Sequence, residues 1–253
     1  MNQNVTKARL KAGETVFGVF TPFPSPTVVE LLGLGGFDFV IIDCEHGPMS
    51  PEMAENMVRA AQLSGATPIV RVAQNVQQVI LRYMDTGAQG IHIPMVNTKA
   101  DAEAVVRSVK YPPIGVRGLA GVRAAEYGAK QSLGEYVKTA NQETLVVCHV
   151  ETMQAVQNLP EITTVEGLDV IFIGPTDLSS AMGLPGQTAN PAVQEAIAQA
   201  IKTIIDGGKI AGTMARDVAS ARQFMDMGVR YITTASVAMI LGAARDFNQK
   251  VRS

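Results

Sequence analysis

Acidic, basic and imidazole side chains stand at or near the ends of several apolar runs in this sequence. Carboxylates can hold a hard divalent cation, imidazole transfers protons near neutral pH, and guanidinium binds oxyanions. A site built from these groups would suit proton transfer or metal-assisted chemistry. The candidates are Asp43, Glu45 and His46 after one run, Arg71 in the next, His149 and Glu151 after a later one, and Asp177 after the one that follows.

Lysine is missing from these positions, because every lysine falls in an expected helix or ahead of an apolar run. An aldolase can activate a ketone either through a lysine Schiff base or through a metal ion. The sequence therefore predicts no Schiff base.

Glu151 and Asp177 are the candidate metal ligands. They end successive runs, so parallel strands would bring both carboxylates to one edge, where Mg²⁺, Mn²⁺ or Co²⁺ could bind. Each acid alone is equally well explained as a loop residue, and Asp177 in GPTDLSS could cap a following helix. Their matching positions favour the metal.

His149 and Glu151 are two residues apart, so in a strand they face the same side, while Cys148 faces the other. We expect His149 one layer below the metal ligand, either as a hydrogen-bonded filler or as a contact to the ligand or substrate. His92 is expected in the same interior, as a structural residue outside the site.

A soft-metal site is the alternative use of the residues that suit zinc: Cys44, His46, Cys148 and His149. The opposite facing of Cys148 and His149 argues against it. Both cysteines are predicted to be buried, reduced thiols.

Eight apolar runs alternate with helical stretches, and most follow a glycine that would end a helix. Nearly continuous apolar runs are typical of parallel strands covered on both faces. At 253 residues this pattern favours one α/β domain, a (β/α)8 TIM barrel over residues 1–253. The runs are VFGVF (16–20), FVIIDCEH (39–46), PIVRV (68–72), GIHIPMV (90–96), LVVCHVE (145–151), VIFIGPTD (170–177), IAGTM (210–214) and YITTAS (231–236).

Composition excludes several classes of protein. With 47% hydrophobic and 17% charged residues and a net charge of −2, no tail for nucleic acid or an anionic membrane is present. Neither a signal peptide nor a run of about 18 apolar residues appears, so we expect a cytoplasmic protein. No GxGxxG or GxxxxGK[ST] motif follows the first run, which argues against a nucleotide cofactor.

Five segments in this order resemble the HpcH/HpaI family, the metal-dependent class II pyruvate aldolases. The likeness extends from about residue 16 to about residue 247, and its motifs are specific. The segments are DCEHGP (43–48), MDTGAQGIHIPMVNT (84–98), YPPIGVRG (111–118), VETMQAVQNLPEI (150–162) and VEGLDVIFIGPTDLS (165–179).

The resemblance implies a phosphoenolpyruvate/pyruvate-type (β/α)8 barrel whose C-terminal helix is exchanged between subunits of a hexamer, a trimer of dimers. It also implies reversible cleavage of 4-hydroxy-2-oxo acids to pyruvate and an aldehyde. Glu151 and Asp177 match the family's metal ligands, and the backbone N–H groups of Thr176 and Asp177 match its donors to the pyruvate carboxylate.

The remaining catalytic roles also come from the resemblance. Arg71 matches the arginine that stabilises the enolate, His46 the acid–base histidine, and Asp85 the carboxylate partner of that histidine. Asp43 and Glu45 are expected either to orient His46 or to hold a subunit interface.

Two positions on the substrate side depart from the family pattern: His149 stands where glutamine is common, and Phe20 where tryptophan is frequent. The acceptor aldehyde therefore stays open among succinic semialdehyde, a hydroxyaldehyde such as lactaldehyde, and a tartronate-type aldehyde. Arg117 and Arg123, in an excursion over residues 111–144, could bind a distal substrate group or be solvated loop residues.

Two other functions compete with the aldolase. An oxaloacetate decarboxylase or macrophomate synthase-like enzyme would use the same residues to form the same enolate. A noncatalytic 2-oxo acid binding protein would not need a base such as His46.

Overall fold

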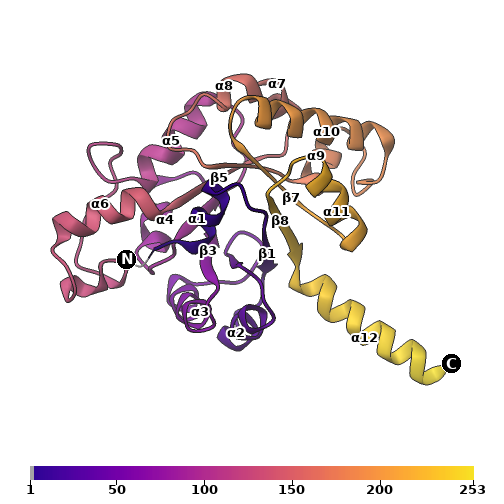
Figure 1. The fold of residues 1–253 in the computed structure, drawn as a ribbon, viewed down its shortest axis with the longest axis horizontal. Helices are drawn as coiled ribbons and strands as arrows, with labels where there is room; N and C mark the ends of the chain where they lie inside the picture. Colours follow the sequence, from indigo (N-terminus) through magenta and orange to yellow (C-terminus); the bar gives the residue numbers. More distant parts are fainter. Residues whose placement is uncertain (1–2) are drawn as a thin grey trace.

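The computed structural model describes residues 3–253, which form the predicted closed barrel of parallel strands wrapped by helices. The strands neighbour one another in chain order, and β8 closes the ring on β1 (Figure 1). They are β1 (Val16–Thr21), β2 (Phe39–Asp43), β3 (Thr67–Arg71), β4 (Gly90–Ile93), β5 (Leu145–Val150), β6 (Val170–Ile173), β7 (Ile210–Met214) and β8 (Tyr231–Ala235).

Helix α1 precedes β1, a helix follows every strand, and most of these helices cover the outside of the barrel. They are α1 (Val5–Lys11), α2 (Pro26–Leu34), α3 (Pro51–Leu63), α4 (Gln77–Met84), α5 (Lys99–Val109), the 3₁₀ helix η1 (Arg123–Gly128), α6 (Leu133–Glu143), α7 (Met153–Gln157), α8 (Leu159–Ile162), α9 (Pro175–Ala181), α10 (Pro191–Asp206), α11 (Val218–Asp226) and α12 (Ser236–Arg252).

The predicted runs that end in polar residues are longer than the strands. β2 stops at Asp43, so Glu45 and His46 lie in the turn that follows. β6 stops at Ile173, and Asp177 lies in the first turn of α9 rather than at the end of a strand. Pro175 explains the second difference, because proline lacks an N–H for the ladder and suits the first turn of a helix.

The glycines predicted to end helices all adopt positive φ, between 75° and 94°. This left-handed conformation is open to glycine and turns the chain from each helix into the next strand. The six are Gly36, Gly65, Gly87, Gly167, Gly208 and Gly228.

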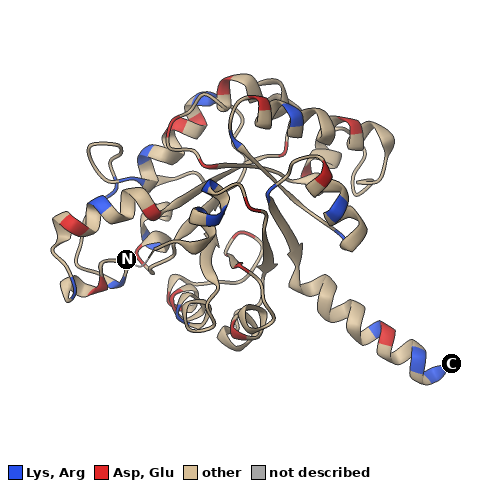
Figure 2. Cartoon of the chain, in the orientation of Figure 1, with Lys and Arg blue, Asp and Glu red and all other residues tan. Residues whose placement is uncertain are grey.

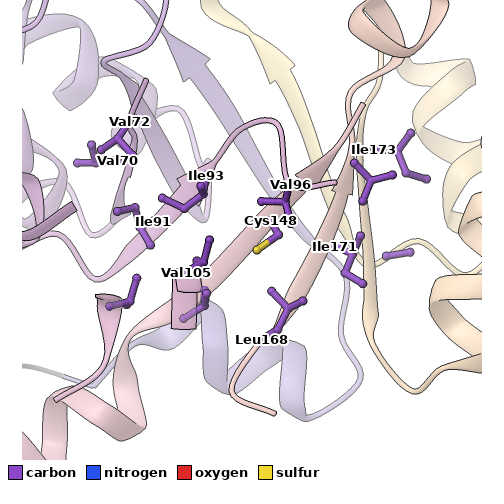
Figure 3. Close-up of a cluster of buried hydrophobic side chains, with 14 of the residues drawn as sticks. Val70, Val72, Ile91, Ile93, Val96, Val105, Cys148, Leu168, Ile171 and Ile173 are labelled. Atoms are coloured by element: carbon purple, nitrogen blue, oxygen red, sulfur yellow. The ribbon is translucent and has the colours of Figure 1, made fainter. Parts of the chain in front are cut away.

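The core has two layers because alternate residues of each strand face opposite sides. Val70, Ile91 and Cys148 face outward and pack against the helices (Figure 3). Phe39 belongs to the inner cluster around the barrel axis. A Cβ atom on Gly18 would lie 2.0 Å from the Phe39 ring, so this close approach requires glycine.

Helix α12 leaves the barrel instead of covering it. It projects away from the body of the chain (Figure 1), and Ser236 is its only buried residue. Among residues 3–253, no helix has the length and apolar character needed to cross a membrane. Acidic and basic residues are interspersed over the outer helices (Figure 2).

Candidate active site

Arg71 is held by two carboxylates at the carboxyl ends of β2 and β3. Its Nε and Nη2 donate to Asp43 Oδ1 and Oδ2 at 2.8 and 2.6 Å. Its Nη1 lies 3.2 Å from Glu45 Oε2. Asp43 and Arg71 are direct partners in the parallel register, so the strand pairing itself brings their charges together. The guanidinium is therefore fixed at the carboxyl ends of β2 and β3.

Arg71 lowers the pKa of both Asp43 and Glu45, but burial opposes it with a different outcome at each acid. Burial alone would raise the pKa of Asp43, but the hydrogen bonds and charge of Arg71, with the N–H groups of His46 and Glu45, hold it below its ordinary value. Glu45 is different, because burial raises its pKa and the charges of Arg71 and His46 offset this only in part. Asp43 is thus the permanent counter-ion of Arg71.

Asp43 and Glu45 were expected to orient His46 or to hold an interface. Asp43 holds Arg71 and also accepts the backbone N–H groups of Glu45 and His46 at 3.2 and 3.3 Å, and a role of either acid in a subunit interface stays a prediction. The imidazole of His46 has one close charged neighbour among the described residues, Glu45, at 3.9 Å, and is 65% exposed. His46 therefore stands at the open face, free to reach a ligand.

The Glu151 carboxylate is held from both sides. Its Oε1 accepts the backbone N–H of Met95 at 2.7 Å, and its Oε2 lies 3.5 Å from His149 Nδ1. Met95 has a φ of 55°, a conformation that costs about 1–2 kcal/mol for a residue with a side chain. Burial would raise the pKa of Glu151, but His149, the Met95 N–H and Arg71 lower it below the ordinary value. Glu151 is therefore an anion at neutral pH.

Glu151 and Asp177 face a common space beside Gly174. A Cβ atom on Gly174 would lie 3.0 Å from Glu151 Oε2 and 3.9 Å from Asp177 Oδ2. The space is open because residue 174 has no side chain, and its donors are carboxylate oxygens, which suit a hard divalent cation. No group of three or more His, Cys, Asp or Glu within residues 3–253 forms a metal cluster, so these two acids are the donors that the chain offers here.

The layer below the carboxylates is aromatic. His149 lies in it, as its spacing from Glu151 predicts, within 5.0 Å of His92 and 4.7 Å of Phe172 between ring centres. Phe20 lies under Arg71, whose guanidinium carbon is 4.7 Å from the ring centre. Phe20 and His149 are buried and support the charged groups from below, and a contact of either with substrate stays a prediction.

Asp85 and His46 do not meet among the described residues. Asp85 Oδ1 instead accepts from Arg117 Nη2 at 2.8 Å. Arg117 is buried and its guanidinium lies over the Tyr111 ring, so it is not a solvated loop residue, and its binding of a distal substrate group stays a prediction. The role of Asp85 as partner of His46 stays a prediction.

The other residues singled out in the sequence lie apart from the carboxylates. Arg123 ties the excursion to the barrel, donating to Thr86 O at 2.6 Å and to Gln62 Oε1 at 2.8 Å. Cys44 and Cys148 are free thiols, and Cys148 faces outward, away from His149. This rules out the zinc set considered above.

Sequence reasoning missed two features of this end of the barrel. The sequence could have predicted the Asp43–Arg71 ion pair, because residues of opposite charge end two adjacent strands. Tyr231 had no such signal: it opens its strand, and only the assembled barrel brings its hydroxyl 2.7 Å from His92 Nε2.

Asp43→Asn should lower the free energy of unfolding by about 3 kcal/mol at neutral pH, because a buried guanidinium loses its main partner. The pKa of Asp43 is lowered on folding, so its contribution is present above the unfolded-state pKa and is lost as the pH falls through the folded-state pKa. The difference between wild type and variant should therefore shrink below about pH 4. Urea unfolding across pH measures it, and a difference that does not change with pH would contradict the assignment.

Known proteins resemble the chain over almost its whole length. The hydroxypyruvate/pyruvate aldolase of Roseobacter denitrificans is 36% identical over 250 residues, which cover 98% of this chain and 96% of that protein. The 4-hydroxy-2-oxo-heptane-1,7-dioate aldolase of Escherichia coli is 34% identical over 244 residues, covering 96% and 93%.

A solved structure matches the fold closely. The HpcH/HpaI aldolase/citrate lyase family protein of Burkholderia cenocepacia superimposes with a TM-score of 0.94 at 33% identity, covering 99% of this chain and 100% of that one. The sequence profile of the family matches residues 16–241, which include every candidate site residue named above. The chain belongs to the HpcH/HpaI aldolase/citrate lyase family.

Proposed function

We propose that the protein is a metal-dependent pyruvate aldolase that cleaves 4-hydroxy-2-oxo acids to pyruvate and an aldehyde and catalyses the reverse addition. The observation that carries this is the arrangement at one end of the barrel. Two carboxylates share an open space at Gly174, and a fixed guanidinium lies close enough to lower the pKa of one of them, Glu151. The names of the two aldolase relatives support the same reaction.

Glu151 and Asp177 would hold the divalent cation, with Mg²⁺, Mn²⁺ and Co²⁺ as the candidates. When bound, the ion would supply Lewis-acid polarisation to the carboxylate and ketone oxygens of a 2-oxo acid. The backbone N–H groups of Thr176 and Asp177, in the first turn of α9, are the proposed donors to the carboxylate.

His46 would carry out the proton transfer, and Arg71 would stabilise the enolate. His46 takes the proton of the C4 hydroxyl, the C3–C4 bond breaks, and its electron pair passes to C3 as the aldehyde leaves. Arg71 stabilises the negative charge that develops on the ketone oxygen as the enolate forms. Because Asp43 and Glu45 fix Arg71 beforehand, little reorganisation accompanies this step. Proton return to C3 completes pyruvate.

The reaction is tested with purified protein, pyruvate, Mn²⁺ and a panel of aldehydes, with adducts followed by mass spectrometry. A four-carbon semialdehyde, a hydroxyaldehyde and a tartronate-type aldehyde distinguish the acceptor classes. We expect an adduct with at least one, lost after exhaustive chelation and restored by Mn²⁺. Activity that survives chelation would contradict the metal site. Oxaloacetate decarboxylation without any adduct would favour the decarboxylase instead.

Arg71→Ala and His46→Ala should separate enolate formation from cleavage. We expect Arg71→Ala to lose about 10²–10³-fold in both cleavage and exchange of the pyruvate methyl protons, because the enolate loses its charge partner. His46→Ala should lose about 10²–10⁴-fold in cleavage while still binding pyruvate. Solvent-deuterium exchange followed by NMR, beside a cleavage assay, measures both. Wild-type exchange in Arg71→Ala would refute its role.

We also propose that the chains assemble by exchange of α12 into a hexamer. The helix exposes Ile240, Leu241 and Phe247 to solvent. A largely apolar groove, lined in part by Phe17 and Ile232, lies on the outer face of β1 and β8, where the eighth helix of a complete ring would pack. A second copy of α12 fits the chemistry of this groove, and the exchange would cover the apolar side chains that both surfaces expose.

Ile240→Asp should shift the assembly to smaller species, raising its dissociation constant at least about tenfold, because the carboxylate would lose its hydration at the interface. Gln249→Asp, on the same helix, is the matched control that adds the same charge at a polar position. Sedimentation velocity at several concentrations measures both. Unchanged assembly in Ile240→Asp would exclude α12 from the interface.

A further inference from the structure

A line of polar groups crosses the barrel interior from β8 to the Glu151 carboxylate. The Tyr231 hydroxyl lies 2.7 Å from His92 Nε2, and His92 Nδ1 lies 2.7 Å from His149 Nε2. At the far end His149 Nδ1 faces Glu151 Oε2 at 3.5 Å, the longest of the three contacts. Neither His92 nor Tyr231 belongs to the site predicted from the sequence.

Aromatic rings enclose this line. Phe39 stacks on Tyr231 with ring centres 4.3 Å apart, and Phe172 lies 5.5 Å from His92. His92 and Tyr231 have no exposed surface and His149 only 1%. Burial lowers the pKa of the His92 imidazole and raises that of the Tyr231 hydroxyl, so both groups are neutral at neutral pH. Water is excluded from this part of the barrel, so a hydrogen-bond donor or acceptor without a partner there would lower the stability of the fold.

The two ends of the line fix the direction of the two hydrogen bonds between Tyr231, His92 and His149. An ionised carboxylate only accepts, so His149 must present Nδ1–H to Glu151 and keep Nε2 as an acceptor. His92 must then donate from Nδ1 and accept at Nε2. The Tyr231 hydroxyl donates to that Nε2, which is its only hydrogen-bond partner within residues 3–253. The opposite direction would aim a lone pair at the carboxylate and leave the hydroxyl proton without an acceptor.

We propose that Tyr231, His92 and His149 are positioning residues, a one-way hydrogen-bond chain that points Nδ1 of His149 at Glu151 and holds its carboxylate for the cation. The Met95 N–H holds the other oxygen, so the orientation of the carboxylate is set before any ligand binds. Groups that orient a metal ligand in this way tune metal affinity without touching the metal. The purpose of the chain rests on the proposed metal site, but its existence does not.

The tautomers can be read directly, because the sequence has three histidines. In metal-free protein labelled with ¹⁵N-histidine, we expect two imidazoles protonated at Nδ1 only, with Nε2 unprotonated. His46→Ala removes the third set of signals and completes the assignment. A proton on Nε2 of either His92 or His149 would overturn the chain.

Tyr231→Phe tests the coupling to Glu151. Removing the hydroxyl leaves His92 Nε2 without a donor, so the two histidines should become mixtures of tautomers. Mn²⁺ affinity, measured by calorimetry on the full-length protein, should fall about tenfold. Tyr136→Phe is the matched control: it also removes a buried hydroxyl, 3.4 Å from that of Tyr111, far from Glu151 in the fold, and should change neither readout. Wild-type Mn²⁺ affinity in Tyr231→Phe would overturn the positioning role.

The two measurements separate this proposal from the proposed function. If the wild-type protein shows both Nδ1–H tautomers but binds no Mn²⁺, the metal site is wrong and the positioning role falls with it. If it binds Mn²⁺ with a different pair of tautomers, the metal site stands and the chain is refuted. A fall in Mn²⁺ affinity with unaltered tautomers would also refute the chain, because a general loss of stability would then explain it.

Discussion

Alternation along parallel strands is the constraint on which this molecule depends. Every second side chain of a closed barrel points to its axis, so the interior is filled in layers, and the last layer opens at the carboxyl ends of the strands. Asp43, Arg71 and Glu151 occupy that layer because each stands at or just after the end of an inward-facing series. The polar layer at the carboxyl ends of the strands and the aromatic layer beneath it both follow from the two-residue alternation of side chains along each strand.

The charged residues of this layer are stable because their charges are paired before any ligand binds. Arg71 has lost most of its contact with water, and the Asp43 carboxylate compensates for that loss with two hydrogen bonds. A buried cation held by a fixed anion keeps its position when a ligand arrives, which is the condition for stabilising a charge that exists only briefly. The Met95 backbone does the same for Glu151, at the cost of a strained conformation.

The sequence was sufficient for the barrel, because apolar runs and helix-ending glycines report local backbone conformation and eight of them leave little choice of fold. It also predicted which side His149 faces, since that depends on spacing alone. It was wrong about the ends of β2 and β6, because proline and turn hydrogen bonds decide where a strand stops. The contacts of Arg117 and Tyr231 could not be predicted from the sequence, because their partners come from distant segments that only the closed barrel brings together.

Glycine stands at positions 18 and 174 for two different physical reasons. Gly18 is needed for packing, because the Phe39 ring fills the space that a methyl group would occupy. Gly174 has a φ of −88°, which any amino acid adopts, so neither backbone nor ring demands glycine there. What a side chain would fill is the space before two carboxylates. A side chain at residue 174 would therefore act first on the two carboxylates, because its Cβ atom would lie 3.0 Å from Glu151 Oε2.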